Sequence, residues 1–147
     1  MGLTADGCMK AGGYVKGYIT SFLDEFEKRH EEISELHVTH SMHERKLKMF
    51  ENADAFVAMP GGLGTLDEMF EVMTWKQIGL HKKNIVFWNL DGYWSPLIEN
   101  LLPNLIQEGF VREEDLNLYA VADTLDDVIQ ALHAPPEGAV DFVAKWG

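Results

Sequence analysis

The sequence predicts a doubly wound α/β fold, in which helices cover both faces of a parallel sheet. Segments with strand character alternate with segments with helix character, and few of the tight-turn signals that join antiparallel strands occur between them. The apolar run at residues 55–59 ends at Pro60, which is typical of a short buried parallel strand. With 147 residues, 46% of them hydrophobic, the chain is long enough for one domain with a buried core. We expect that domain to cover residues 1–134 and a C-terminal tail to cover residues 135–147.

The first half of the chain is expected to alternate helices and strands. A helix that starts near Gly2 should end before Gly12 and Gly13, because glycine commonly ends helices. Ser41 is the expected N-cap of a later helix, with Glu44 three residues on to complete a capping box. In order, the prediction is a helix at residues 2–11, a strand at 14–20, a charged stretch of helix and loop at 24–35, a strand at 36–39 and a helix that runs from the cap to residue 51.

The second half continues this alternation. The prediction is a strand at residues 55–59, a helix at 65–80, a strand at 84–89, a helix at 94–108 that is interrupted at Pro103, a strand at 117–121 and a helix at 124–133. Met69, Met73 and Leu80 lie on the first of these helices, and we interpret them as packing residues.

The charge of the chain excludes several classes of partner. The formal net charge is −12, from 24 acidic and 12 basic residues. Nucleic acids and anionic membrane surfaces attract basic patches, so neither is an expected partner. No apolar stretch reaches the roughly 20 residues that a membrane-spanning helix needs. Cys8 is the only cysteine, which excludes an internal disulfide and fits a reducing cytoplasm.

The segment with the clearest chemical meaning is Pro-Gly-Gly-Leu-Gly-Thr-Leu-Asp-Glu at residues 60–68, between an expected strand and an expected helix. Glycines there let the backbone turn sharply and approach a ligand closely. Thr65 falls near the helix start, where its hydroxyl can cap the helix or touch a ligand. Free N–H groups and the positive helix end form an anion site, and open parallel sheets bind ligands beyond the carboxyl ends of their strands. The segment therefore predicts a phosphate-binding loop.

Two common nucleotide motifs do not fit this loop. No Gly-Lys-Ser/Thr follows it, as a Walker A motif requires, and the spacing is not Gly-x-Gly-x-x-Gly. The plainer alternative is a tight turn that binds nothing, and three glycines behind a proline favour the phosphate site over it. Glu68 also has two interpretations. It either stabilises the helix dipole or lies beside a bound phosphate ester, where it stabilises a developing cation or activates a water.

The pattern Pro-Gly-Gly-x-Gly-Thr-x-x-Glu at residues 60–68 resembles the signature of the cytokinin riboside 5′-monophosphate phosphoribohydrolases, the Lonely Guy family. Many of its members were long labelled lysine decarboxylases. A second family segment, Met-His-x-Arg-Lys, matches residues 42–46, and residues 71–81 and 89–93 also resemble the family. The match runs without evident gaps from Met1 to about Leu132. Two separate motifs at consistent spacing make this resemblance specific.

The resemblance implies a Rossmann-like fold and a homodimer that uses no cofactor and no metal. It implies a small-molecule substrate, an adenine nucleoside 5′-monophosphate whose N-glycosidic bond is hydrolysed to free base and ribose 5-phosphate. The catalytic pair falls on Arg45 and Glu68. The substrate-binding positions implied by the same matching are Glu27, Lys46, Gly61, Gly62, Gly64, Thr65 and Thr74.

These assignments agree with the chemistry of the reaction. Cleavage of a ribose–base bond passes through an oxocarbenium-like state, which a nearby carboxylate such as Glu68 stabilises. The fork of Arg45 can hold phosphate or ribose oxygens. A guanidinium keeps its proton throughout the neutral range, which argues against a role for Arg45 as general acid.

The family pattern also predicts a difference. It begins with a strand–helix–strand unit before the position that matches Met1, so we expect this chain to lack that unit. A fragment, a misassigned start and a naturally short protein all fit. The rival hypotheses are a non-catalytic nucleotide or molybdenum-cofactor binding module of the same fold, and a truncated inactive relative. The presence of both Arg45 and Glu68 favours the enzyme.

Three histidines suggest a metal site at first sight. His37, His40 and His43 recur at every third residue. The first two lie on or beside an expected strand and the third opens a helix, so the rings need not converge, and no cysteine or carboxylate completes a zinc set. We expect no metal at these histidines, and His43 to support the helix start beside Arg45.

Overall fold

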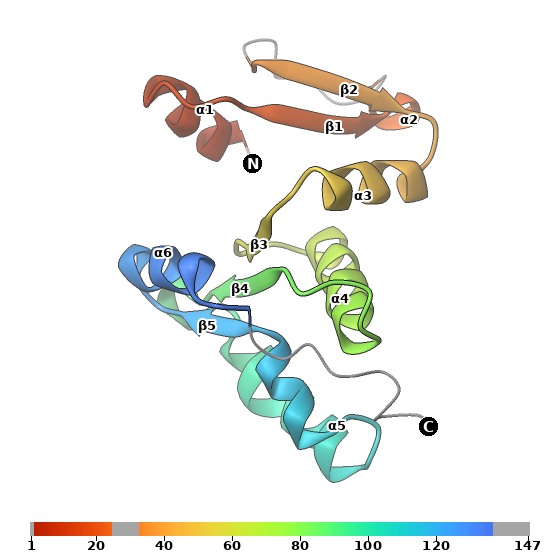
Figure 1. The fold of residues 1–147 in the computed structure, drawn as a ribbon, viewed down its shortest axis with the longest axis vertical. Helices are drawn as coiled ribbons and strands as arrows, with labels where there is room; N and C mark the ends of the chain where they lie inside the picture. Colours follow the sequence, from red (N-terminus) through yellow and green to blue (C-terminus); the bar gives the residue numbers. More distant parts are fainter. Residues whose placement is uncertain (1, 25–32, 137–147) are drawn as a thin grey trace. The chain divides into compact units, whose positions relative to one another are not determined.

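The computed structural model describes residues 2–24 and 33–136 and has an α/β fold in which all paired strands are parallel (Figure 1). This confirms the predicted fold class. The chain divides into two compact units, Met1–Ala53 and Asp54–Gly147. The described strands form a two-stranded sheet and a three-stranded sheet, where the sequence predicted a single one. The assignment of residues 1–134 to one domain stays a prediction.

The first unit is built around a parallel pair of strands. Its elements are α1 (Gly2–Lys10), β1 (Lys16–Thr20), α2 (Ser21–Asp24), β2 (Glu35–Thr39) and α3 (Met42–Glu51). Tyr18 of β1 lies opposite His37 of β2, and their rings stack with centroids 4.9 Å apart. On the same face, Lys16 pairs with Glu35 at 3.9 Å between Nζ and Oε2. Cross-strand pairs of this kind stabilise a sheet.

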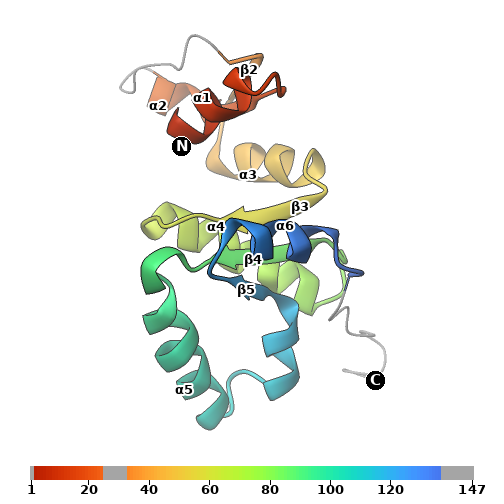
Figure 2. The same cartoon turned by 90° about the vertical axis from the view of Figure 1, so that its left-hand side faces the viewer.

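The second unit is a parallel sheet between helices. Its elements are β3 (Ala55–Ala58), α4 (Leu63–Gln77), β4 (Asn84–Trp88), η1 (Leu90–Gly92), η2 (Pro96–Leu101), α5 (Leu102–Gln107), η3 (Glu113–Leu118), β5 (Ala120–Ala122) and α6 (Leu125–His133). The strand order is β3–β4–β5, and the sheet lies between α6 and α4 (Figures 1 and 2).

The core of the second unit lies on both sides of β4. Ile85, Val86 and Phe87 of this strand are almost completely buried, as expected for the central strand of a parallel sheet. Val86 packs with Val128 of α6 in one buried cluster. Phe87 meets the ring of Trp94 edge to face, with centroids 5.5 Å apart. These contacts fix the sheet that carries the glycine segment at its edge.

Two buried polar groups fix the C-terminal half of α4 and the turn that follows. Lys76 is 2% exposed, and its Nζ donates to the carbonyl of Leu118 at 3.0 Å. His81 is buried, with Nε2 2.8 Å from the carbonyl oxygen of Val72 and with Nδ1 accepting the N–H of Lys83 at 3.0 Å. The acceptor role of Nδ1 defines a neutral ring with its proton on Nε2. Burial lowers the pKa of His81.

Several element boundaries differ from the prediction. The helix after the glycine segment begins at Leu63 and ends at Gln77, so Leu80 is outside it and 67% exposed. The interpretation of Leu80 as a packing residue is therefore wrong, whereas Met69 and Met73 are buried as predicted.

The later elements are shorter than expected. The helix predicted for residues 94–108 is a π-helical stretch followed by α5, and Pro103, which has no N–H to donate, lies at the start of α5. The first two residues of the strand predicted for residues 117–121 belong to the 3₁₀ turn η3, and β5 begins only at Ala120. Within the described part of the chain, no helix is both long and apolar enough to span a membrane.

Candidate functional site

The glycine segment lies at the carboxyl edge of the three-stranded sheet. β3 ends at Ala58 and α4 begins at Leu63, so the connection between them leaves the sheet at that edge. Since the strands are parallel, β4 and β5 end at the same edge, at Trp88 and Ala122. Open parallel sheets bind ligands beyond this edge.

The N-terminus of α4 has no side-chain cap. Its N-cap is Gly62, and no side-chain cap bond is made at this helix start within the described residues. The first helical bond runs from the N–H of Leu66 to the carbonyl of Gly62 at 3.1 Å. The N–H groups of the first helical turn precede this bond, and such groups are available to an anion.

The structure gives different explanations for the presence of glycine at the three positions of the loop. A Cβ on Gly61 would overlap the hydroxyl of Thr65 and lie 3.0 Å from its Cβ, so Gly61 is required by the packing of this loop. Apart from its chain neighbours and the backbone of its own helix, a Cβ on Gly62 or Gly64 would have no described atom within 4 Å. Gly62 has φ −98°, and Gly64 lies inside α4, so neither needs a left-handed backbone. The described fold itself therefore does not require glycine at positions 62 and 64.

Thr65 and Glu68 lie on the first turns of α4, and both are half-buried. Residues three apart on a helix are neighbours on its surface, so the hydroxyl and the carboxylate share one side of α4. Thr74 is further along, and its hydroxyl donates to the carbonyl of Phe70 at 2.7 Å. Ideal helix geometry separates it from Glu68 by about 9 Å along the axis and roughly 120° around it. The structure thus does not bring Thr74 to the loop.

Two aromatic residues hold this loop. Sequence reasoning did not assign either of them to the site. The hydroxyl of Tyr93 donates to the carbonyl of Gly61 at 2.8 Å. The indole N–H of Trp94 donates to the carbonyl of Ala58, the last residue of β3, at 3.2 Å. Both residues follow η1, more than 30 positions from their partners, and only the resemblance of residues 89–93 to a family segment pointed to this region.

Asn89 fixes the turn that carries these aromatic residues. Its side-chain oxygen accepts the N–H of Trp94 at 2.8 Å. Its amide nitrogen donates to Ser95 at 3.3 Å and to Asp123 at 3.1 Å, and its backbone N–H donates to the carbonyl of Ala122 at 2.8 Å. One side chain therefore joins the segments that leave β4 and β5.

The other predicted site residues belong to the first unit. Arg45 and Lys46 lie in the first turns of α3, and both are half-buried. The Nε of Arg45 donates to the carbonyl of Tyr18 at 2.9 Å, which attaches α3 to β1. Glu27 lies outside the described residues, and its role stays a prediction.

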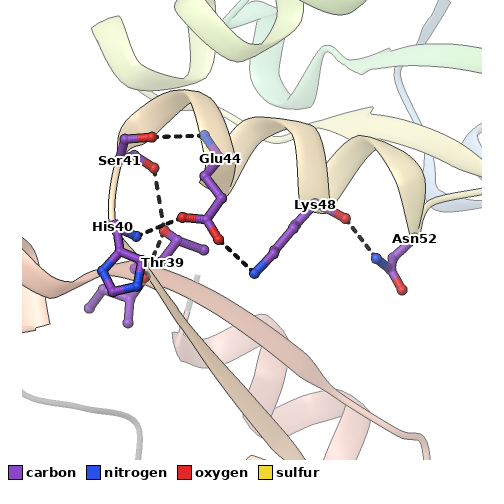
Figure 3. A network of polar contacts seen from close by, with 7 residues as sticks. Thr39, His40, Ser41, Glu44, Lys48 and Asn52 are labelled. Atoms are coloured by element: carbon purple, nitrogen blue, oxygen red, sulfur yellow. Dashed lines mark hydrogen bonds and ion pairs between the residues drawn. The ribbon is translucent and has the colours of Figure 1, made fainter.

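The start of α3 is held by a polar network (Figure 3). Ser41 is the N-cap, and its Oγ accepts the N–H of Glu44 at 3.1 Å, as predicted. The reciprocal bond of a capping box is not made in this structure, because Oε2 of Glu44 accepts the N–H of His40 at 2.8 Å, one residue further upstream. Oε1 of Glu44 forms an ion pair with Nζ of Lys48 at 2.8 Å. The ammonium of Lys48 and the N–H of His40 lower the pKa of Glu44.

The three histidines are placed differently from one another. Nε2 of His37 lies 2.7 Å from Oε1 of Glu35, while His40 and His43 are exposed at the α3 cap. Within residues 2–24 and 33–136, no group of three histidine, cysteine, aspartate or glutamate side chains is arranged to hold a metal ion.

A parallel α/β fold with a glycine-rich loop at the ligand-binding edge of its sheet places the chain in the Rossmann-like class. A family profile described as "Possible lysine decarboxylase" matches residues 1–132, and the chain belongs to this family.

Individual relatives of the chain carry more specific names. The chain is 40% identical to the cytokinin riboside 5′-monophosphate phosphoribohydrolase of Rhodococcoides fascians, over 92% of this chain and 68% of the relative. It is 35% identical to a probable cytokinin riboside 5′-monophosphate phosphoribohydrolase of Oryza sativa subsp. japonica, over 99% of this chain and 60% of the relative. It is 34% identical to such an enzyme of Arabidopsis thaliana, over 99% of this chain and 64% of the relative. The chain thus spans less than two thirds of both plant proteins.

Proposed function

We propose that this protein hydrolyses the N-glycosidic bond of adenine nucleoside 5′-monophosphates, including N6-modified ones. Water adds to the anomeric carbon, the bond from that carbon to the base breaks, and the base leaves with a proton. The products are free base and ribose 5-phosphate. The names of the relatives support this class of hydrolase and this class of substrate.

The observation that carries the proposal is the open space over Gly62 and Gly64. Inside a helix, where Gly64 lies, glycine costs about 0.5–1 kcal/mol relative to alanine, and this cost does not apply to Gly62, which is the N-cap. Neither a positive φ nor a neighbouring described atom calls for glycine at these two positions. Their bare backbone beside uncapped N–H groups suits the close approach of a phosphate ester. Gly61 and Thr65 shape the same loop, and we assign all four residues to phosphate binding.

Glu68 is the proposed catalytic carboxylate. Three residues after Thr65 on the same side of α4, it lies within a helical turn of one of the proposed phosphate-binding residues. A carboxylate beside the anomeric carbon stabilises the oxocarbenium-like transition state and orients the attacking water.

Arg45 is the second proposed catalytic residue, with a guanidinium that holds phosphate or ribose oxygens in a fixed geometry. The Arg45–Tyr18 hydrogen bond uses Nε, which fixes the guanidinium plane by its inner nitrogen. Lys46, Thr74 and Glu27 are proposed as further substrate-binding residues on the strength of the family resemblance.

The experiment is chromatography of the free base released from AMP and from isopentenyladenosine monophosphate. The wild-type chain is compared with Glu68→Gln, which keeps the size of the side chain and removes its charge. We expect base release by the wild type and loss of most turnover in the variant, with phosphate binding largely kept. AMP binding without base release by the wild type would instead support a non-catalytic binding module. Near-wild-type turnover by Glu68→Gln would contradict the mechanism.

We also propose that the protein acts as a homodimer in the cytoplasm. The family resemblance supports the dimer, and the single cysteine fits a reducing compartment. Sedimentation of the purified chain tests the dimer, with a monomer as the contradicting result.

A further inference from the structure

The hydroxyl of Tyr93 is directed at one backbone atom of the glycine loop. It donates to the carbonyl of Gly61 at 2.8 Å, although the residue as a whole is 50% exposed. A half-exposed tyrosine could direct its hydroxyl to water, so burial does not explain this contact.

The ring of Tyr93 is held on a rigid support. It meets the ring of Trp94 edge to face, with centroids 5.0 Å apart. Trp94 is 4% exposed and donates from its indole to Ala58, while its backbone N–H donates to Asn89. The position of the Tyr93 hydroxyl is therefore set by the end of β3 and by the turn after β4.

The contact controls the direction of an N–H group. The peptide between Gly61 and Gly62 is trans, so its carbonyl and its N–H point to opposite sides. When Tyr93 holds the carbonyl, the N–H of Gly62 is directed away from Tyr93. Two adjacent glycines leave a peptide unit free to rotate, so without this hydrogen bond the N–H would sample several directions.

We infer that Tyr93 is a positioning residue that orders the Gly61–Gly62 peptide for the phosphate of the substrate. This inference rests on the proposed function, because the group to be bound is the 5′-phosphate. A loop that is ordered before binding loses less conformational freedom when the ligand arrives. The phosphate is held alike in the ground state and in the transition state, so the loss of the Tyr93 hydroxyl should raise KM and leave kcat nearly unchanged.

The test compares Tyr93→Phe with Tyr119→Phe. The first variant removes only the hydroxyl and keeps the ring on Trp94. The second removes a tyrosine hydroxyl from the same unit; its ring meets that of Phe87 edge to face, and the residue directly precedes β5, at the opposite end of that strand from the carboxyl edge. Binding of ribose 5-phosphate is measured by calorimetry, and KM and kcat with AMP are measured by base release.

We expect Tyr93→Phe to weaken ribose 5-phosphate binding and raise KM by about 2- to 12-fold, the range for the loss of one neutral hydrogen bond, and Tyr119→Phe to match the wild type. In nuclear magnetic resonance spectra, the amide signals of Gly61 and Gly62 should broaden in Tyr93→Phe and sharpen when ribose 5-phosphate is added.

Two results would overturn the inference while the proposed function stands. One is wild-type affinity and unchanged glycine signals in Tyr93→Phe. The other is a fall in kcat with KM unchanged, which would move the role of Tyr93 from phosphate binding to the chemical step. A wild-type chain that neither binds ribose 5-phosphate nor releases base would overturn the proposed function, and the role of Tyr93 with it.

Discussion

Gly64→Ala is expected to make the protein more stable and less able to bind its substrate. Gly64 lies in the first turn of α4, and a Cβ there would have no described atom within 4 Å. Alanine should therefore raise the free energy of unfolding by about 0.5–1 kcal/mol. In a chain of this length that corresponds to a rise in Tm of roughly 1–4 °C.

In the proposed phosphate site, the same methyl group would stand between the helix N-terminus and the phosphate. If it removes one charge-assisted hydrogen bond, worth about 1.5–3 kcal/mol, the affinity for ribose 5-phosphate should fall roughly 12- to 150-fold. Thermal unfolding gives the first quantity and calorimetric titration gives the second. The two effects have opposite directions, so a general loss of folding cannot imitate the expected result.

Two other glycines provide the controls. Gly7 lies inside α1, and its Cβ position is also open in the described structure. Gly7→Ala should therefore raise Tm by a similar amount and leave the affinity for ribose 5-phosphate unchanged. Gly61→Ala forces a Cβ against Thr65 and should lower stability by about 1–3 kcal/mol. If Gly64→Ala gains stability and keeps ribose 5-phosphate affinity within twofold of the wild type, phosphate binding is not the reason for glycine at position 64.

Three further predictions concern stability. Burial lowers the pKa of His81. Below a pH of about 6.5, His81 is therefore protonated in the unfolded chain but stays neutral in the folded chain, which favours unfolding. Tm should therefore decline from pH 7.5 to pH 5, and less steeply in His81→Gln; equal slopes would exclude His81 as a cause. Asp91 has φ 52°, so Asp91→Val should cost about 1–2 kcal/mol in urea unfolding, whereas Asp91→Gly should stay within about 0.5 kcal/mol of the wild type. Thr124 accepts the N–H of Asp127 in a complete capping box, so Thr124→Ala should cost about 1 kcal/mol and Thr124→Ser much less.

The predictions that succeeded depend on short-range chemistry. The start of the helix after Ser41 was predicted because an N-cap needs only residues three apart, and the structure agrees. The strand before Pro60 was predicted because an apolar run between turn residues is a local signal, although only Ala58 of its four residues is buried and the other three are half-buried. The glycine loop was predicted between strand and helix for the same reason.

The predictions that failed depend on competition between partners. The carboxylate of Glu44 accepts the N–H of His40 instead of the N–H of Ser41, and no spacing rule specifies which of the two it binds. Tyr93 and Asn89 act on atoms more than 30 positions away, so their roles follow from the topology of the sheet and not from any motif. The division into two sheets has no signal in the alternation of helices and strands.

The central claim is that the loop after β3 holds a 5′-phosphate while the glycosidic bond is hydrolysed. Base release from AMP, measured beside base release from adenosine at equal concentration, tests this claim most directly, because the two substrates differ only in the phosphate. We predict turnover of AMP and little or none of adenosine. Equal rates with both substrates would contradict the claim, since the glycine loop would then contribute nothing to the reaction.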